Sequence, residues 1–247
     1  TRYWRDWSSD VCSSDLHPGT IEFRVAETAI FVPADFKNKM LEACDHIIDL
    51  ILSPDFLELT NRAIPQGSEV PNENAHSHFI AFDFGICINE KGEYEPKLIE
   101  MQGFPSLFAY EILVDDIFSK HFPPPPGFSS YLGELDRNSY IRDLREIILN
   151  GHAPEEVILL EIFPHKQKTR IDFYCTSDHT GIPVVCITEL IKEGKQLFYL
   201  KDGKKTQVKR NYNRVIFDEL FNQPEEIKKK GSFFFEELDR KSTRLNS

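Results

Sequence analysis

Two strand-like segments of this chain carry side chains suited to metal-assisted chemistry. Asp83 lies in the apolar run HFIAFDFGICI (78–88), and Glu100 and Gln102 lie in KLIEMQ (97–102). Successive side chains of a strand point to opposite faces, so Glu100 and Gln102 share one. If the segments form a hairpin, Asp83 lies opposite Gln102 to within two residues. Two carboxylates and an amide oxygen are hard ligands that suit magnesium bridging to phosphates.

The same residues have a structural interpretation. A carboxylate in an apolar strand is costly unless it is paired or binds a metal, so a Lys or Arg elsewhere is an equally open partner. The segment GFPSL (103–107) follows Gln102, and Pro105 opens a predicted helix. The N–H groups of a helix start favour anions, which indicates a phosphate or carboxylate pocket. A routine strand-to-helix turn remains the alternative.

Two histidines precede Asp83. His76 and His78 are two residues apart and would share a strand face. Together with Asp83 they raise the hypothesis of a zinc site, although nothing else in the chain has the spacing of structural zinc. We expect His78 to face a substrate instead, and a loop or strand-edge histidine without a ligand remains the alternative.

Further along, cations follow a predicted buried strand. The segment HKQKTR (165–170) comes directly after EEVILLEIF (155–163), and open α/β sheets bind ligands at the carboxyl ends of their strands. Lys166 and Arg170 are therefore candidates for holding a carboxylate or phosphate, and a solvated basic turn is the alternative. Arg214 differs, because its apolar neighbours in YNRVIF predict a partly buried, paired guanidinium.

The elements that must position these residues follow from periodicity and turn chemistry. A strand, a helix and a second strand predict a β-α-β unit in a small parallel, Rossmann-like sheet. A hairpin is predicted around Asp202-Gly203. The expected helices cover 33–52, 55–63, 105–122, 138–150 and 165–181; the expected strands cover 78–88, 97–102, 155–163 and 182–188, and the second hairpin covers 196–210.

Composition narrows the class of protein. The 247 residues include 29 Lys+Arg and 40 Asp+Glu, a formal charge of −11, and 40% are hydrophobic. This is globular composition, and the acidic balance argues against a nucleic-acid partner. No run approaches the roughly 18 apolar residues of a membrane span. The five cysteines form no C-x-x-C pair, which indicates reduced thiols and a cytoplasmic location. The sequence does not predict an oligomeric state.

Both ends of the chain look foreign to the rest. Residues 1–16 and 240–247 resemble translated sequencing-adaptor read-through at the ends of assembled metagenomic fragments, so we expect an internal piece of a longer protein. Between them we expect a helical region with the carboxylate hairpin over 17–122, a Pro-rich linker over 123–137 around PPPPG, and a Rossmann-like α/β region over 138–239.

The order of these segments resembles the circularly permuted ATP-grasp ligases, the group of glutathione synthetase and glutathionylspermidine synthetase. A set of uncharacterised bacterial ATP-grasp-like proteins is more similar still. AFDFGICI (81–88) and LIEMQGFPS (98–106) stand where the family has a strand with an Asp and a strand ending Glu-x-Asn. KRNYNRVIFDEL (209–220) stands where it has an Arg-hydrophobic strand. The resemblance covers about 75–239 and implies an α/β fold: a pre-ATP-grasp-type helix/hairpin region, then a Rossmann-like sheet with an extra hairpin.

The resemblance implies an ATP-dependent ligase with small-molecule carboxylate and amine substrates. The carboxylate would be phosphorylated to an acyl phosphate, and the amine would displace the phosphate. Glu100 and, with Gln replacing Asn, Gln102 would bind Mg²⁺ on ATP. Arg214 would be the catalytic residue that stabilises negative charge, and Asp83 would orient or bind substrate.

The chain also departs from the family pattern. Ala81 stands where some relatives have an Arg that holds a substrate carboxylate. The ATP-binding Lys strands, the glycine-rich flap and the last acidic magnesium ligand lie downstream in the family, so we expect this piece to be inactive alone. The alternative is a non-catalytic α/β small-molecule-binding module, which Ala81 and Gln102 favour.

Overall fold

The computed structural model describes residues 17, 19–26, 28–66, 69–71, 77–236 and 238, and the backbone of 243–245. The chain folds as two compact units. One is formed by residues 29–105. The other is formed by the segments that flank it in sequence, up to residue 28 and from residue 106. Both units contribute helices and strands, so the predicted α/β fold class is confirmed.

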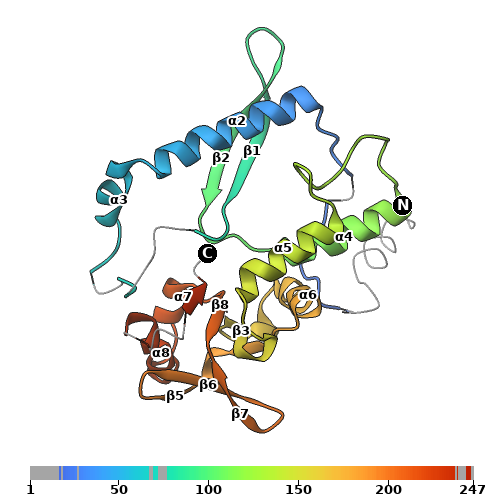
Figure 1. The fold of residues 1–247 in the computed structure, drawn as a ribbon. Coiled ribbons are helices and arrows are strands. Elements are labelled where there is room, and N and C mark those ends of the chain that lie inside the picture. The colour runs from blue at the N-terminus through green and yellow to red at the C-terminus, as the bar shows by residue number, and fades with distance from the viewer. Residues whose placement is uncertain are drawn as a thin grey trace. The chain divides into compact units, whose positions relative to one another are not determined.

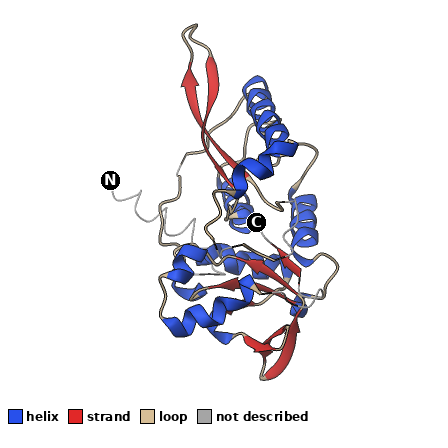
Figure 2. Cartoon of the chain, turned by 90° about the vertical axis from the view of Figure 1, so that its left-hand side faces the viewer, coloured by secondary structure: helices blue, strands red, loops and turns tan. Residues whose placement is uncertain are grey.

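The first unit combines two helices with a hairpin. Helix α2 (Ala34–Ile51) follows Pro33, and Pro54 begins helix α3 (Pro54–Asn61). Strands β1 (Ala81–Ile88) and β2 (Tyr94–Gln102) pair antiparallel, and Figure 2 shows them as a long two-stranded ribbon. Helix α2 lies against β2, where the Lys39 ammonium donates to the Tyr94 carbonyl at 3.1 Å. The predicted helices and hairpin are confirmed.

The apolar run 78–88 is typical of a strand buried on both faces, but the structure shows that this strand is not buried in that way. Ile86 and Ile88 are 50% and 66% exposed, and Ile99 of the partner strand is 70% exposed. An unbroken apolar run indicates a buried strand when other elements cover both faces of its sheet. In the described part of the chain, β1 and β2 have only each other as strand neighbours.

The second unit contains a parallel sheet in the order β4-β3-β8-β9. These strands are β3 (Val157–Glu161), β4 (Val184–Cys186), β8 (Arg210–Asn213) and β9 (Thr243–Leu245). Helix α6 (Arg170–Thr180) connects β3 to β4, which confirms the predicted β-α-β unit. The first four residues of β3 are fully buried, as an apolar strand at the centre of such a sheet must be.

Helices cover both faces of this sheet. Figure 1 shows α5 (Arg137–Leu149) and α6 on one side of β3 and β8, and α7 (Phe217–Phe221) and α8 (Glu225–Gly231) on the other. On the second side, Ile158 and Leu160 of β3 join one apolar core with Leu220, Phe233 and Phe234. Helix α4 (Phe108–His121) packs against α6. The chain therefore leaves β3 and β8 on opposite faces.

A separate antiparallel sheet completes the second unit. Its strands are β5 (Ile191–Glu193), β6 (Gln196–Lys201) and β7 (Lys204–Val208). The turn between β6 and β7 is Asp202-Gly203, both with positive φ, as predicted. Lys205 pairs with Glu193 and lies 4.8 Å from the Phe198 ring centre, so the basic hairpin is partly neutralised by its own neighbours.

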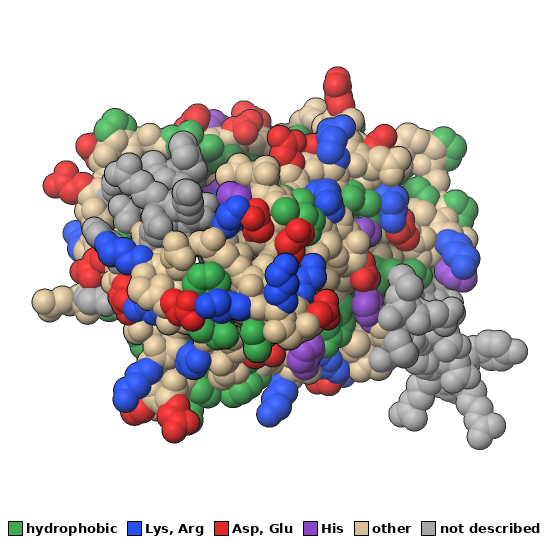
Figure 3. Space-filling view, turned by 60° about the horizontal axis from the view of Figure 1, so that its bottom comes forward, with side chains coloured by type: hydrophobic (Ala, Val, Ile, Leu, Met, Phe, Trp, Pro, Cys, Tyr) green, Lys and Arg blue, Asp and Glu red, His purple; other side chains and the backbone are tan. Residues whose placement is uncertain are grey.

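The surface carries both charges. Figure 3 shows Lys and Arg side chains interspersed with Asp and Glu on the face it presents. None of the helices in the described part of the chain is long and apolar enough to span a bilayer.

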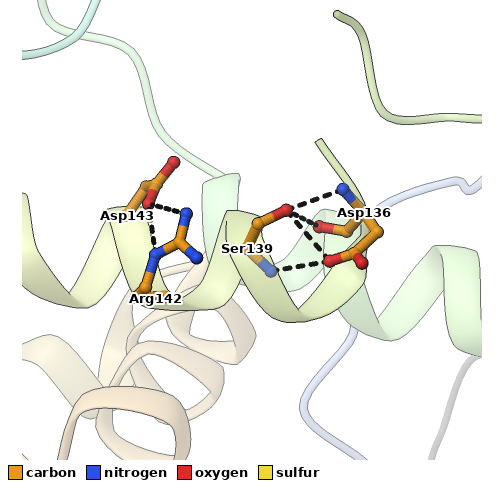
Figure 4. Close-up of polar contacts among 4 residues, drawn as sticks. All are labelled: Asp136, Ser139, Arg142 and Asp143. Carbon is orange, nitrogen blue, oxygen red and sulfur yellow. Dashed lines mark hydrogen bonds and ion pairs between the residues drawn. The ribbon is translucent and has the colours of Figure 1, made fainter. Parts of the chain in front are cut away.

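Helix α5 begins with a reciprocal side-chain cap. The Asp136 carboxylate accepts from the Ser139 N–H at 2.8 Å, and the Ser139 hydroxyl accepts from the Asp136 N–H at 2.7 Å (Figure 4). This reciprocal capping box satisfies two N–H groups that the helix leaves unbonded. The hydrogen bonds from Ser139 lower the pKa of Asp136. Because the folded-state pKa is lowered, the contribution to stability is present at neutral pH and is lost as the carboxylate is protonated in acid.

We predict that Asp136→Ala lowers the midpoint of thermal unfolding by roughly 2–4 °C at pH 7. The difference should shrink as the pH falls below the ordinary pKa of aspartate. The control is Asp143→Ala on the same helix, which removes only an exposed pairing with Arg142. Equal losses for both variants in thermal melts would contradict the capping role.

Candidate functional site

The predicted carboxylate cluster forms on the hairpin. Asp83 pairs in register with Glu100, two residues from Gln102, and Ala81 pairs with Gln102. A bulge in β2 beside Asp83 brings the three polar side chains together. The Gln102 amide nitrogen donates to Asp83 Oδ2 and to Glu100 Oε1, both at 2.9 Å. One amide therefore links two carboxylates that strand pairing has set side by side.

This arrangement fits a hard cation. The two carboxylates meet at one amide group, and half a turn of that group would present its oxygen in place of its nitrogen. Asp83, Glu100 and Gln102 would then supply three oxygens, and water or phosphate would complete the six that Mg²⁺ requires. Within the described ranges no group of three or more His, Cys, Asp or Glu side chains could hold a metal by itself, so the amide is essential to the fit.

Of the two histidines of the zinc hypothesis, the structure describes His78. His78 precedes β1 and is half-buried. His76 lies outside the described residues, so their joint role stays a hypothesis. The expected substrate contact of His78 also remains a prediction.

A second polar cluster lies in the parallel sheet of the other unit. From β3 the chain passes through α6 to β4, whereas from β8 it passes through α7 and α8 to β9. These connections diverge, so the carboxyl ends of β3 and β8 form a topological switch point. Open α/β sheets bind their ligands at such points. Glu161 ends β3 there, and Arg214 follows the last residue of β8.

Glu161 and Arg214 occupy equivalent positions on neighbouring strands. Leu160 pairs with Asn213, and the Arg214 N–H donates to the Leu160 carbonyl at 2.8 Å. Glu161 is 5% exposed and Arg214 is 7% exposed. The Arg214 guanidinium lies 5.9 Å from the centre of the Tyr212 ring. The sequence predicts a partly buried and paired Arg214: its burial is confirmed and is more complete than predicted, and its pairing stays a prediction.

Burial perturbs the acidity of Glu161. Desolvation raises the pKa of its carboxyl from 4.5 to about 8. The hydrogen bond that Glu161 Oε1 accepts from the Ile162 N–H, at 2.6 Å, opposes this shift, as does the charge of Arg214. The Glu219 charge adds to it. Sequence reasoning missed Glu161; its signal was a lone carboxylate that ends an otherwise apolar strand, VILLE.

Asp172 of α6 is buried in the same unit. Its carboxylate accepts from the Ala109 N–H at 3.1 Å and from the Tyr110 N–H at 3.0 Å, so it caps α4. Burial raises the pKa of Asp172, whereas these donors and the charge of Arg214 lower it. Leu107, immediately before α4, has φ 75°, a strained conformation for a non-glycine residue.

The predicted anion-binding cations have different partners. Lys166 is exposed, with its ammonium 5.2 Å from the centre of the Phe163 ring. Arg170 Nη2 lies 2.7 Å from Glu22 Oε1 and donates to the Gly19 carbonyl at 3.1 Å. Arg170 thus pairs with a carboxylate of the chain itself, and the expected substrate contacts of Lys166 and Arg170 stay predictions.

The predicted site residues fall into two groups. His78, Asp83, Glu100 and Gln102 belong to the unit of residues 29–105, and Lys166, Arg170 and Arg214 belong to the other unit. Within the first group the structure brings Asp83, Glu100 and Gln102 together.

Comparison with known proteins gives a distant likeness among solved structures. No family model matches the sequence, and a search of curated proteins finds no match. Among solved structures, the chain is similar to the apo form of a glutathione synthetase-like effector from Globodera pallida, with a TM-score of 0.46 and 13% identity. The match covers 86% of this chain and 62% of that one, so this chain spans about three fifths of its length. Function must therefore be argued from the sites.

We predict that Glu161→Gln stabilises the protein at alkaline pH. The folded state keeps the Glu161 proton up to about pH 8, whereas the unfolded state releases it near the ordinary pKa of glutamate. The stability of the wild type therefore decreases as the pH rises from that ordinary pKa to about 8. Since Gln cannot ionise, the variant should exceed wild type by about 1–3 kcal/mol at pH 8–9 and match it near pH 5. Urea unfolding across pH measures this. Exposed Glu134→Gln is the control, and a pH-independent difference for Glu161→Gln would contradict the assignment.

Proposed function

We propose that this chain is part of an ATP-dependent ligase that joins a small-molecule carboxylate to an amine with the help of Mg²⁺. The observation that carries the proposal is the Gln102 amide, which bridges the carboxylates of Asp83 and Glu100 on the hairpin. The two residues expected to bind metal, Glu100 and Gln102, touch each other and a third oxygen-bearing side chain.

In this proposal Glu100 and Gln102 hold Mg²⁺ through a carboxylate oxygen and the amide oxygen. The metal would neutralise the phosphate charge of ATP during phosphoryl transfer to the substrate carboxylate. Asp83 accepts from the Gln102 amide in this structure. It would orient that amide or bind substrate, because it lies on the strand opposite Glu100.

The second unit would supply positive charge. Arg214 is 93% shielded from solvent at the carboxyl end of β8. A guanidinium in such surroundings stabilises developing negative charge more strongly than one in water. Lys166 and Arg170 follow β3 and would bind the anionic part of a substrate. The four cysteines of the described part are free thiols, which suits the cytoplasm that we infer for this protein.

A binding module without catalysis is the second candidate function. The observation in its favour is the switch point, where Glu161 and Arg214 lie side by side without any need for metal. Such a module would bind a small anionic ligand equally well with and without Mg²⁺. Metal dependence of ATP binding therefore separates the two functions.

The test uses Mn²⁺ in place of Mg²⁺ and measures its binding to the whole chain by electron paramagnetic resonance, with and without ATP. We predict that Glu100→Gln weakens Mn²⁺ binding in the presence of ATP at least tenfold. The control, Glu90→Gln, removes the same charge from an exposed position in the turn of the same hairpin, and it should bind as wild type does.

Two results would contradict the ligase proposal. One is equal Mn²⁺ binding by wild type and the Glu100→Gln variant. The other is ATP binding that is unchanged when the divalent cation is removed, which would favour the binding module. Thermal melts of both variants establish that the comparison is made between folded proteins.

A further inference from the structure

The first turn of α6 holds a segment from the start of the chain. Arg170, the first residue of α6, contacts Glu22 and the Gly19 carbonyl. Further along the helix, His17 Nε2 lies 2.7 Å from Asp178 Oδ2. The segment of residues 19–26, here called the N-terminal strap, is therefore fastened to α6 by the Glu22 side chain and the Gly19 carbonyl, and His17 adds a contact just before it.

Two chain segments join this unit to the unit of residues 29–105, and the first turn of α6 contacts the second of them as well. That unit is entered after residue 28 and left before residue 106. Asp172 fixes the start of α4 just beyond the exit, and Arg170 fixes the strap just before the entrance. The rings of Phe23 and Tyr110 meet edge to face, with centres 5.6 Å apart. Entrance and exit are thus tied to one point of α6.

We propose that Arg170 is an anion-binding residue whose resting occupant is the Glu22 carboxylate, and that a phosphate- or carboxylate-bearing ligand binds there by displacing the N-terminal strap. Glu22 acts as an internal competitor for the guanidinium. Ligand binding and release of the strap are then one event.

Exposure of the two partners supports exchange. The Arg170 side chain is 13% exposed, whereas that of Glu22 is 52% exposed. The guanidinium is thus held in place by the fold, and the carboxylate reaches it from solvent. Ion pairs with one partner in water contribute little to stability, so a ligand of modest affinity can replace Glu22.

The positive charge around Arg170 favours an anion that carries more negative charge than the single carboxylate of Glu22. Lys166 and Lys168 lie four and two residues before it in the sequence, and both are exposed. The N-terminal end of α6 adds partial positive charge. One carboxylate therefore faces a segment that contains three cations, and phosphate, with two charges, would match it better. The alternative is that the ion pair of Arg170 with Glu22 only holds the strap in place.

Anion binding at Arg170 requires no ATP, magnesium or ligase chemistry. Arg170 belongs to a unit that contains neither Glu100 nor Gln102. Loss of metal binding at the hairpin would leave it intact, and failure at Arg170 would leave the hairpin site intact.

The experiment titrates the whole chain with inorganic phosphate and, separately, with acetate at constant ionic strength. Calorimetry gives the affinity. We expect Glu22→Gln to tighten phosphate binding about fivefold, because the internal competitor is gone while the cations remain. Tighter binding of acetate alone would assign the site to carboxylates, and of phosphate alone to phosphates. Arg170→Gln should abolish the gain when combined with Glu22→Gln.

Amide hydrogen exchange of residues 19–26 supplies the second readout. Phosphate should accelerate exchange in wild type and leave the Glu22→Gln variant, which already exchanges fast, unchanged. The control is Glu134→Gln, which removes an exposed carboxylate of the same unit and should behave as wild type does. Unchanged anion affinity in Glu22→Gln, or exchange that phosphate leaves unaltered in wild type, would overturn the proposal.

Discussion

Burial of one carboxylate, that of Asp172, determines how several elements of the second unit meet. An isolated buried charge is strongly unfavourable, so Asp172 needs donors wherever it lies. It finds them in the first N–H groups of α4 and in the charge of Arg214 beside β8. Helices α4 and α6 are therefore joined by one group. Because α4 begins directly after the unit of residues 29–105, the same contact also fixes where the chain returns from that unit.

The Glu161 carboxylate is also removed from solvent, but it accepts fewer hydrogen bonds than the Asp172 carboxylate does. Asp172 accepts from two helix N–H groups, whereas Glu161 accepts from the N–H of the residue next to it. Burial raises the pKa of both carboxyls, and that of Glu161 moves to about 8, so that Glu161 changes charge near neutral pH. A titratable carboxyl beside a buried arginine at a topological switch point is the kind of arrangement that functional sites use. Glu161 is therefore a candidate for the functional site, whereas Asp172 caps α4.

Much of the fold was predictable, because it depends on local patterns. The β-α-β unit, the Asp202-Gly203 turn and the clustering of Asp83 with Glu100 and Gln102 follow from periodicity and strand pairing. The exposure of the hairpin was not predictable, because an apolar run does not reveal whether anything covers it. The partner of Arg170 was missed for a related reason. Glu22 lies 148 residues away along the chain, and no local pattern links the two.

The central claim is that Glu100 and Gln102 hold the metal of an ATP-dependent reaction. The most direct test is a crystal of the protein with MnCl₂ and a non-hydrolysable ATP analogue, examined by anomalous scattering at the manganese edge. The account predicts a manganese peak within bonding distance of a Glu100 carboxylate oxygen and the Gln102 amide oxygen, in contact with the nucleotide phosphates. A nucleotide bound with no manganese at the hairpin, or manganese bound only to other carboxylates, would contradict it.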